Sequence, residues 1–177
     1  MLHTLFPPVA DVAARKQRDR SDNLRQFTSA ADDSKLHVDS VNVQAYPQAT
    51  LTDEQRTIVN CDATTLLELI RERVYTSTQV LAAIVTVAIR ANDVTNCLTE
   101  SCLKEAFERA RQLDKHLKDT GRVVGPLHGL PVSIKDHIKV RGLDTSTGYV
   151  GKHRILLAHK TVTYSLSSLG VQEGGRQ

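Results

Sequence analysis

The chain has 177 residues, of which 40% are hydrophobic and 24% are charged, which is the size and composition of about one globular domain. Its net charge of +3 is mild and only 4% of its residues are aromatic, so neither a basic surface nor a stacking platform favours a nucleic-acid partner. The longest apolar run, residues 80–89, is far shorter than the roughly 20 residues of a membrane-spanning helix, and we expect no membrane partner.

The first 50 residues predict a charged helix followed by an irregular arm. Two prolines precede residues 9–27, and the start of a helix tolerates proline. The basic run at 15–20 would suit a transit peptide, but aspartates lie around it and such peptides avoid acidic residues. We therefore expect a solvated helix face and a cytoplasmic protein. Residues 28–48 are polar and predict an arm laid over the surface.

Three amphipathic helices are predicted between residues 62 and 121. Asp62 is expected to cap the first helix, and Thr76 or Ser77 the second. Gly121 fits the left-handed position that often follows the last turn of a helix. Apolar residues repeat at spacings of three and four, as on one helix face: Leu66, Leu67, Ile70 and Val74; then Val80, Leu81, Ile84, Val85, Ala88 and Ile89; then Leu103, Ala106, Phe107, Ala110, Leu113 and Leu117.

The third helix also carries opposite charges one turn apart. Glu105 precedes Arg109 by four residues, and Asp114 precedes Lys118 by the same spacing. Pairs of this kind stabilise a helix by a few tenths of a kcal/mol each, as a rough guide. We therefore expect this helix to be the best defined of the three.

A change of pattern after the third helix predicts β-structure. Residues 130–134 are apolar, partly β-branched and bounded by glycine and proline, which is typical of a strand. Residues 138–140 predict a second short strand. Helices leading into a short buried strand indicate the α/β class. We expect N-terminal helices packed on the start of a mixed β-sheet that is incomplete in this chain.

Lys135 stands at the end of the predicted strand. An ordinary lysine is almost fully protonated at neutral pH, so it becomes a base only where apolar surroundings disfavour its charge. On a strand, Ser133 and Lys135 face one side while Asp136 faces the other, so this carboxylate need not pair with the amine. On these residues alone, a surface lysine is the simpler interpretation.

Longer stretches around this lysine resemble the amidase signature family, in its fungal acetamidase-like branch. Gly125-Pro126-Leu127-His128-Gly129-Leu130-Pro131-Val132-Ser133-Ile134-Lys135-Asp136 resembles the lysine segment of that family, and residues 144–149 resemble the loop after it. Residues 52–58 and 96–100 resemble the preceding segments. The resemblance implies the amidase signature fold and a Ser-Ser-Lys triad, a convergent alternative to Ser-His-Asp. It assigns the triad lysine to Lys135, the one catalytic residue that can be carried over.

The two serines of such a triad would follow the lysine in a glycine-rich segment. Ser167-Ser168 lies between leucines with no flanking glycine, and we interpret the pair as exposed serines of a helix. We therefore expect an N-terminal helix and irregular arm at 1–50, the N-terminal part of an amidase domain at 51–150, and a divergent tail at 151–177. The tail is either a divergent helix or the product of an incorrect gene model.

No other constellation in the sequence predicts a site. The three cysteines, Cys61, Cys97 and Cys102, have no zinc or disulfide spacing and predict buried, reduced thiols. His128 is interpreted as structural, and nothing supports a nucleophile built from Cys61 and His137. No phosphate-binding glycine motif is present, so we expect neither metal nor cofactor.

The resemblance implies that the full-length relative hydrolyses a small carboxamide to a carboxylate and ammonia. The 177-residue chain by itself is expected to be inactive, because a base without its nucleophile cannot form an acyl-enzyme. Two alternatives stay open. One is a non-catalytic fragment that acts only by binding, and the other is a glutamine-dependent amidotransferase subunit of the same family.

Overall fold

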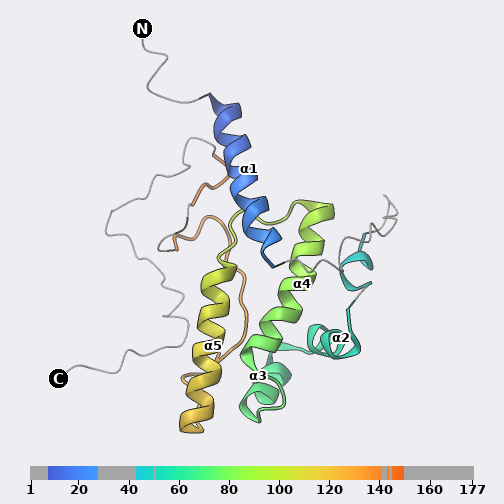
Figure 1. Ribbon diagram of the computed structural model, residues 1–177, viewed down its shortest axis with the longest axis vertical. Helices are drawn as coiled ribbons and strands as arrows, with labels where there is room; N and C mark the ends of the chain where they lie inside the picture. Colours follow the sequence, from blue (N-terminus) through green and yellow to red (C-terminus); the bar gives the residue numbers. More distant parts are fainter. Residues whose placement is uncertain (1–7, 28–42, 50, 141–142, 144, 150–177) are drawn as a thin grey trace, which may run out of the picture.

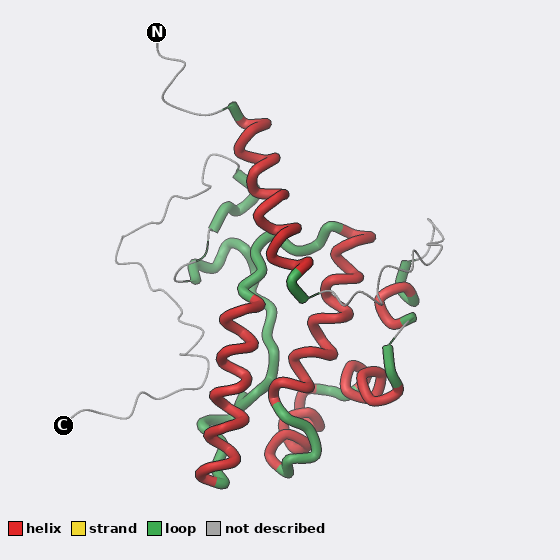
Figure 2. Tube along the Cα trace, viewed as in Figure 1, coloured by secondary structure: helices red, strands yellow, loops and turns green. Residues whose placement is uncertain are grey.

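The computed structural model describes residues 8–27, 43–49, 51–140, 143 and 145–149. This part of the chain is helical, and Figure 2 shows helices and loops but no strand within it. The elements drawn in Figure 1 are α1 (Val9–Arg25), η2 (Tyr46–Gln48), α2 (Asp53–Asn60), α3 (Ala63–Arg71), α4 (Ser77–Thr95) and α5 (Leu103–Thr120). None of these helices is both long and apolar enough to cross a bilayer.

The predicted caps are confirmed at three helix ends. The Asp62 carboxylate accepts a hydrogen bond from the Thr65 N–H at 3.0 Å at the start of α3. Thr76, rather than Ser77, caps α4, where its hydroxyl accepts from the N–H of Gln79 at 3.1 Å. Gly121 follows α5 with a φ of +70°, the left-handed conformation that glycine adopts without steric conflict.

Two details of the predicted helices are wrong. Val74 was expected on the apolar face of the helix after Asp62, but α3 ends at Arg71 and Val74 is 55% exposed. Helix α2 was not predicted, although Thr52 and Gln55 carry its signal. The Thr52 hydroxyl accepts from the Gln55 N–H at 3.2 Å while the Gln55 side chain accepts from the Thr52 N–H at 3.0 Å, which is a capping box.

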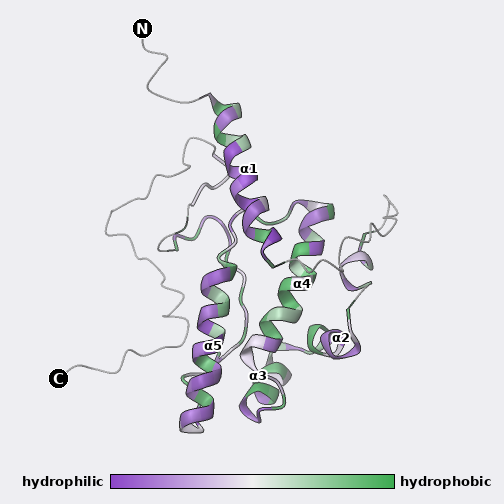
Figure 3. Ribbon diagram, viewed as in Figure 1, coloured by the Kyte–Doolittle hydropathy of each residue, from purple (hydrophilic) through white to green (hydrophobic). Residues whose placement is uncertain are grey.

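Helix α4 is the apolar centre of the described structure, as its colouring in Figure 3 shows. It contributes to two buried clusters. The first core cluster joins α2, α3, α4 and α5 through Ile58, Leu66, Ile70, Val80, Ala83 and Leu117. The second core cluster joins α1, α4 and α5 through Leu24, Leu81, Val85, Ile89 and Ala110. Burial of these side chains from water is the main force that packs the helices around α4.

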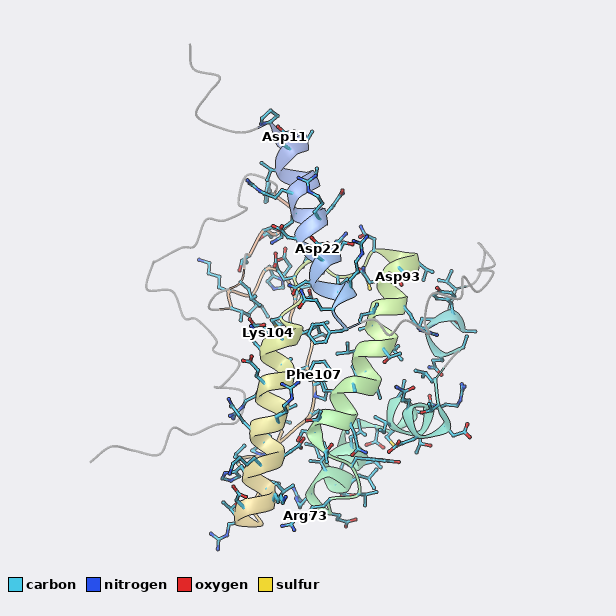
Figure 4. The ribbon with its side chains drawn as sticks, in the orientation of Figure 1. Asp11, Asp22, Arg73, Asp93, Lys104 and Phe107 are labelled. Carbon is cyan, nitrogen blue, oxygen red and sulfur yellow. The ribbon has the colours of Figure 1, made fainter. Side chains whose placement is uncertain are left out.

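Helix α1 reaches the second core cluster from a distant part of the sequence. Phe27, just after α1, stacks on Phe107 of α5 with ring centroids 5.2 Å apart, and Figure 4 labels Phe107 on α5. Arg20 donates to the Leu98 carbonyl and to the Asn96 side chain, both at 2.7 Å. The charged helix predicted at 9–27 is therefore confirmed, and it rests on the loop between α4 and α5.

The predicted strands at 130–134 and 138–140 are not formed in the described residues, where Val140 alone makes an isolated bridge. A strand needs a neighbouring strand to pair its backbone N–H and C=O groups, and the described residues supply none. Two apolar side chains of this region are consequently left open to solvent, Val132 at 47% and Ile138 at 37% exposure. The mixed sheet expected from the sequence is absent from the part of the chain that the structure describes.

Asp114 does not make the surface pair with Lys118 that its spacing predicted. Its carboxylate instead accepts hydrogen bonds from the Ser77 N–H at 2.6 Å, the Thr78 N–H at 3.1 Å and the Thr78 hydroxyl at 2.6 Å. These donors belong to the first turn of α4, whose N–H groups have no partner within the helix. A negative charge is favourable at this end of a helix dipole, so Asp114 fastens α5 to the start of α4.

Replacing Asp114 should therefore destabilise the whole described structure. Asp114→Ala removes three charge-assisted hydrogen bonds and should lower the free energy of unfolding by about 2 kcal/mol, measured by urea denaturation of the 177-residue chain. Asp119→Ala is the matched control, because Asp119 on the same helix makes only an exposed ion pair with Lys115, and such pairs contribute little. Equal effects of the two substitutions would contradict this role of Asp114.

Candidate active-site segment

Lys135 lies in a turn on the surface of the described structure. Its carbonyl accepts a hydrogen bond from the Ile138 N–H at 2.9 Å, which closes the turn directly after the lysine. The Lys135 side chain is exposed. The described residues therefore present the lysine but do not enclose it in the apolar surroundings that a lysine base requires.

Asp136 bonds to residues further along the chain, and strand alternation does not account for this because Lys135 and Asp136 lie in no strand. Its carboxylate accepts from the Ser146 hydroxyl at 2.9 Å and from the Thr147 N–H at 2.7 Å. Thr147 has a φ of +53°, an uncommon conformation for a residue with a side chain. Asp136 thus ties the turn of Lys135 to residues 145–149, a contact that spacing in the sequence did not reveal.

The other end of the segment is anchored on the helices. His128 is only 3% exposed, and its Nδ1 accepts a hydrogen bond from the Val124 N–H at 3.2 Å. Gly129 has a φ of +78°, and a Cβ atom there would lie 2.4 Å from Ser77 Oγ at the start of α4. Leu130 then packs against the first core cluster. The chain is held firmly five residues before Lys135.

Burial lowers the pKa of His128 below its ordinary value, because a charged imidazole is disfavoured away from water. The positive charges of His116 and Arg109 act in the same direction, and the carboxylate of Asp114 opposes them. This supports the interpretation of His128 as a structural residue that is neutral near pH 7.

The remaining sequence candidates form no second site in the described residues. Cys61, Cys97 and Cys102 are free thiols. The expectation that all three are buried is wrong, because Cys97 is exposed and the other two are only partly buried. Burial raises the pKa of the Cys102 thiol, which makes it a poor nucleophile. No group of three or more metal-binding side chains occurs within the described ranges, and Ser167-Ser168 lies outside them.

A small polar cavity lies between α1 and the loop before α5. Its volume is about 40 Å³ and it is lined by charged and polar side chains, among them Lys16, Arg20 and Glu100. A site for a small organic ligand usually encloses some 300 Å³ or more. The cavity is therefore large enough for water and far smaller than a usual ligand site.

Comparison with known proteins supports the fold of the described helices. Residues 79–172 match the family described as Amidase. The structure resembles that of a fatty acid amide hydrolase, with a TM-score of 0.70 and 29% sequence identity over 81% of this chain and 26% of the other. These similarities define the class: an amidase-signature fold that carries a lysine segment after its N-terminal helices.

Sequence relatives are consistent with this class. Amidase 1 of Gibberella moniliformis is 38% identical over 72% of this chain and 24% of its own length. The acetamidase of Emericella nidulans is 33% identical over 80% of this chain and 25% of its own length. The chain belongs to the amidase family, and it spans about a quarter of the length of these relatives.

The close approach at Gly129 can be tested against a second glycine with the same backbone conformation. Gly129→Ala places a methyl group against Ser77 and should lower the free energy of unfolding by roughly 2–4 kcal/mol. Gly148 has a φ of +80° with open space around it, so Gly148→Ala should cost only about 1 kcal/mol. Urea denaturation of both variants separates the effect of the contact with Ser77 from the effect of backbone strain. Equal losses in the free energy of unfolding would show that the contact with Ser77 is unimportant.

Proposed function

We propose that this chain is the N-terminal portion of an amidase that hydrolyses carboxamide C–N bonds to a carboxylate and ammonia. The observation that carries the proposal is the family match over residues 79–172, which includes Lys135 and the segment anchored before it. The reaction needs no metal or cofactor in this proposal. The substrate class is a small amide, and three free thiols among the described residues suit a reducing compartment such as the cytoplasm.

In the proposed mechanism, Lys135 is the base of a Ser-Ser-Lys triad. Its neutral Nζ takes a proton that is relayed through one serine from the nucleophilic serine. The nucleophile attacks the amide carbonyl, and the C–N bond breaks as the lysine returns the proton to the departing amine. Water then attacks the acyl-enzyme and releases the carboxylate. Both serines are assigned to parts of the enzyme outside this chain.

The contacts on either side of Lys135 support this proposal. Lys135 is fixed between the anchor at His128 and the Asp136 contact with residues 145–149, so its backbone position is defined at both ends. Its amine is exposed, and so are the nearby apolar side chains of Val132 and Ile138. We propose that the rest of the enzyme covers this apolar surface and provides the dry surroundings of the amine.

The relatives favour amide hydrolysis over the alternative functions. Amidase 1 and the acetamidase carry names that describe hydrolysis of amides, and they match most of this chain. No contact within the described residues favours an amidotransferase subunit or a binding module. We therefore retain hydrolysis of small amides as the proposed function.

The chain by itself should be inactive. Purified residues 1–177 should release no more ammonia from short-chain amides than the Lys135→Ala variant does, because Lys135 has no catalytic serine to serve. Ammonia can be followed with a coupled dehydrogenase assay. Release that exceeds the background and disappears in the variant would show that the chain is a complete enzyme, against the proposal.

A chimera tests the role of Lys135 in a complete amidase. Residues 51–149 should replace the aligned stretch of Amidase 1 from Gibberella moniliformis, and the active chimera is then compared with three variants. Lys135→Arg keeps the positive charge but cannot give up its proton, so it should lower kcat at least about 100-fold, as should Lys135→Ala.

Lys118→Ala, which changes an exposed lysine of α5, is the matched control and should keep the activity of the chimera. Retention of activity by Lys135→Arg would mean that the residue acts through its charge and not as a base. A chimera that is inactive but as stable as Amidase 1 would contradict the proposal that residues 51–149 are equivalent to the stretch they replace.

A further inference from the structure

The imidazole of His128 closes the turn that leads to the lysine segment. The Val124 N–H donates to Nδ1 at 3.2 Å, so Nδ1 carries no proton and the proton of the neutral ring is on Nε2. The backbone of the same turn is closed by the His128 N–H to the Gly125 carbonyl and by the Leu130 N–H to the Leu127 carbonyl, both at 3.2 Å. The side chain and the backbone together fix the path from α5 to Leu130.

A proton on Nδ1 would remove this bond and replace it with repulsion. Nδ1–H and the Val124 N–H would then be two donors facing each other, and a donor buried without an acceptor is unfavourable. The ring also gains nothing elsewhere, because Nε2 is buried without a hydrogen-bond partner in the described residues. A charged ring at 3% exposure is further disfavoured by the loss of hydration.

The groups around His128 do not compensate for the positive charge of a protonated imidazole. The ionisable side chains that act on it lie on α5, where His116 and Arg109 oppose protonation and Asp114 favours it. The Asp114 carboxylate is already bonded to the first turn of α4. The atoms of α4 and α3 that lie nearest to Gly129 belong to the uncharged side chains of Ser77 and Ile70.

We propose that His128 is an acid-sensitive latch whose unprotonated Nδ1 holds the turn at residues 124–130 and whose protonation releases it. Release frees the segment that positions Lys135, since the anchor on α3 and α4 lies directly after the histidine. His128 is thus a positioning residue for the lysine segment. This inference concerns the folded chain itself and stands independently of the proposed amidase activity.

The sign of the pH effect follows from the lowered pKa of His128 in the folded state. The unfolded chain binds the proton more readily, so the stabilising contribution is complete above the ordinary histidine pKa of about 6.5. It is lost as the pH falls from that value through the lower pKa of the folded state. The latch therefore holds at neutral pH and weakens on acidification.

The test uses urea unfolding of the 177-residue chain on both sides of the ordinary histidine pKa, at about pH 7.5 and about pH 5.5. His128→Asn places an amide oxygen near the position of Nδ1 and keeps an acceptor that cannot titrate. The urea midpoint of the wild-type chain should fall on acidification by more than that of His128→Asn. His137→Asn is the control, because it removes an exposed histidine from the same segment. Its urea midpoint should fall on acidification by as much as that of the wild-type chain. An equal fall for His128→Asn and the wild type would overturn the latch.

A second measurement decides the question if His128→Asn does not fold. Nitrogen-15 spectra of the imidazole rings in the wild-type chain should show His128 with its proton on Nε2 at neutral pH. On acidification, the His128 ring should take up its second proton below the ordinary histidine pKa of about 6.5. A proton on Nδ1 at neutral pH, or protonation of His128 at or above the ordinary histidine pKa of about 6.5, would overturn the proposal.

Discussion

The carboxylate of Asp114 at the start of α4 is the contact on which the rest of the described structure depends. It holds the first turn of α4 against α5 through the N–H groups of Ser77 and Thr78. These bonds fix Ser77 in a fully buried position, and Gly129 packs against its side chain. A single carboxylate on one helix thereby determines where the chain passes on its way to Lys135.

Local signals in the sequence were sufficient for α1, α3, α4 and α5, because capping residues and apolar periodicity act within one or two helical turns. Local signals were also present for α2, which was not predicted although Thr52 and Gln55 form a capping box at its start. The role of Asp114 could not be predicted in the same way. Its spacing to Lys118 indicated a surface pair, while its true partners lie 36 and 37 residues earlier, a separation that no local pattern encodes.

The lysine segment shows the same division between local and distant information. Resemblance to a family singled out Lys135, whereas the argument that separated Asp136 from it relied on strand alternation. Alternation presupposes a sheet, however, and no neighbouring strand is present in the described ranges. The surroundings of the amine depend on residues distant in sequence, so the sequence around Lys135 could suggest a candidate residue but could not show what encloses it. The contact of Asp136 with residues 146 and 147 could likewise not be predicted from the sequence around Lys135.

The position of α1 has a consequence for the order in which the chain folds. Arg20 and Asn23 bond to residues that follow them by 76 to 78 positions. During synthesis on the ribosome, α1 emerges first, but its binding surface between α4 and α5 is completed only much later. Most of the stability of a helix in a protein comes from tertiary packing, and closing so long a loop carries an entropic penalty. Helix α1 is therefore expected to be the last described helix to dock, onto a pair of helices that has already assembled.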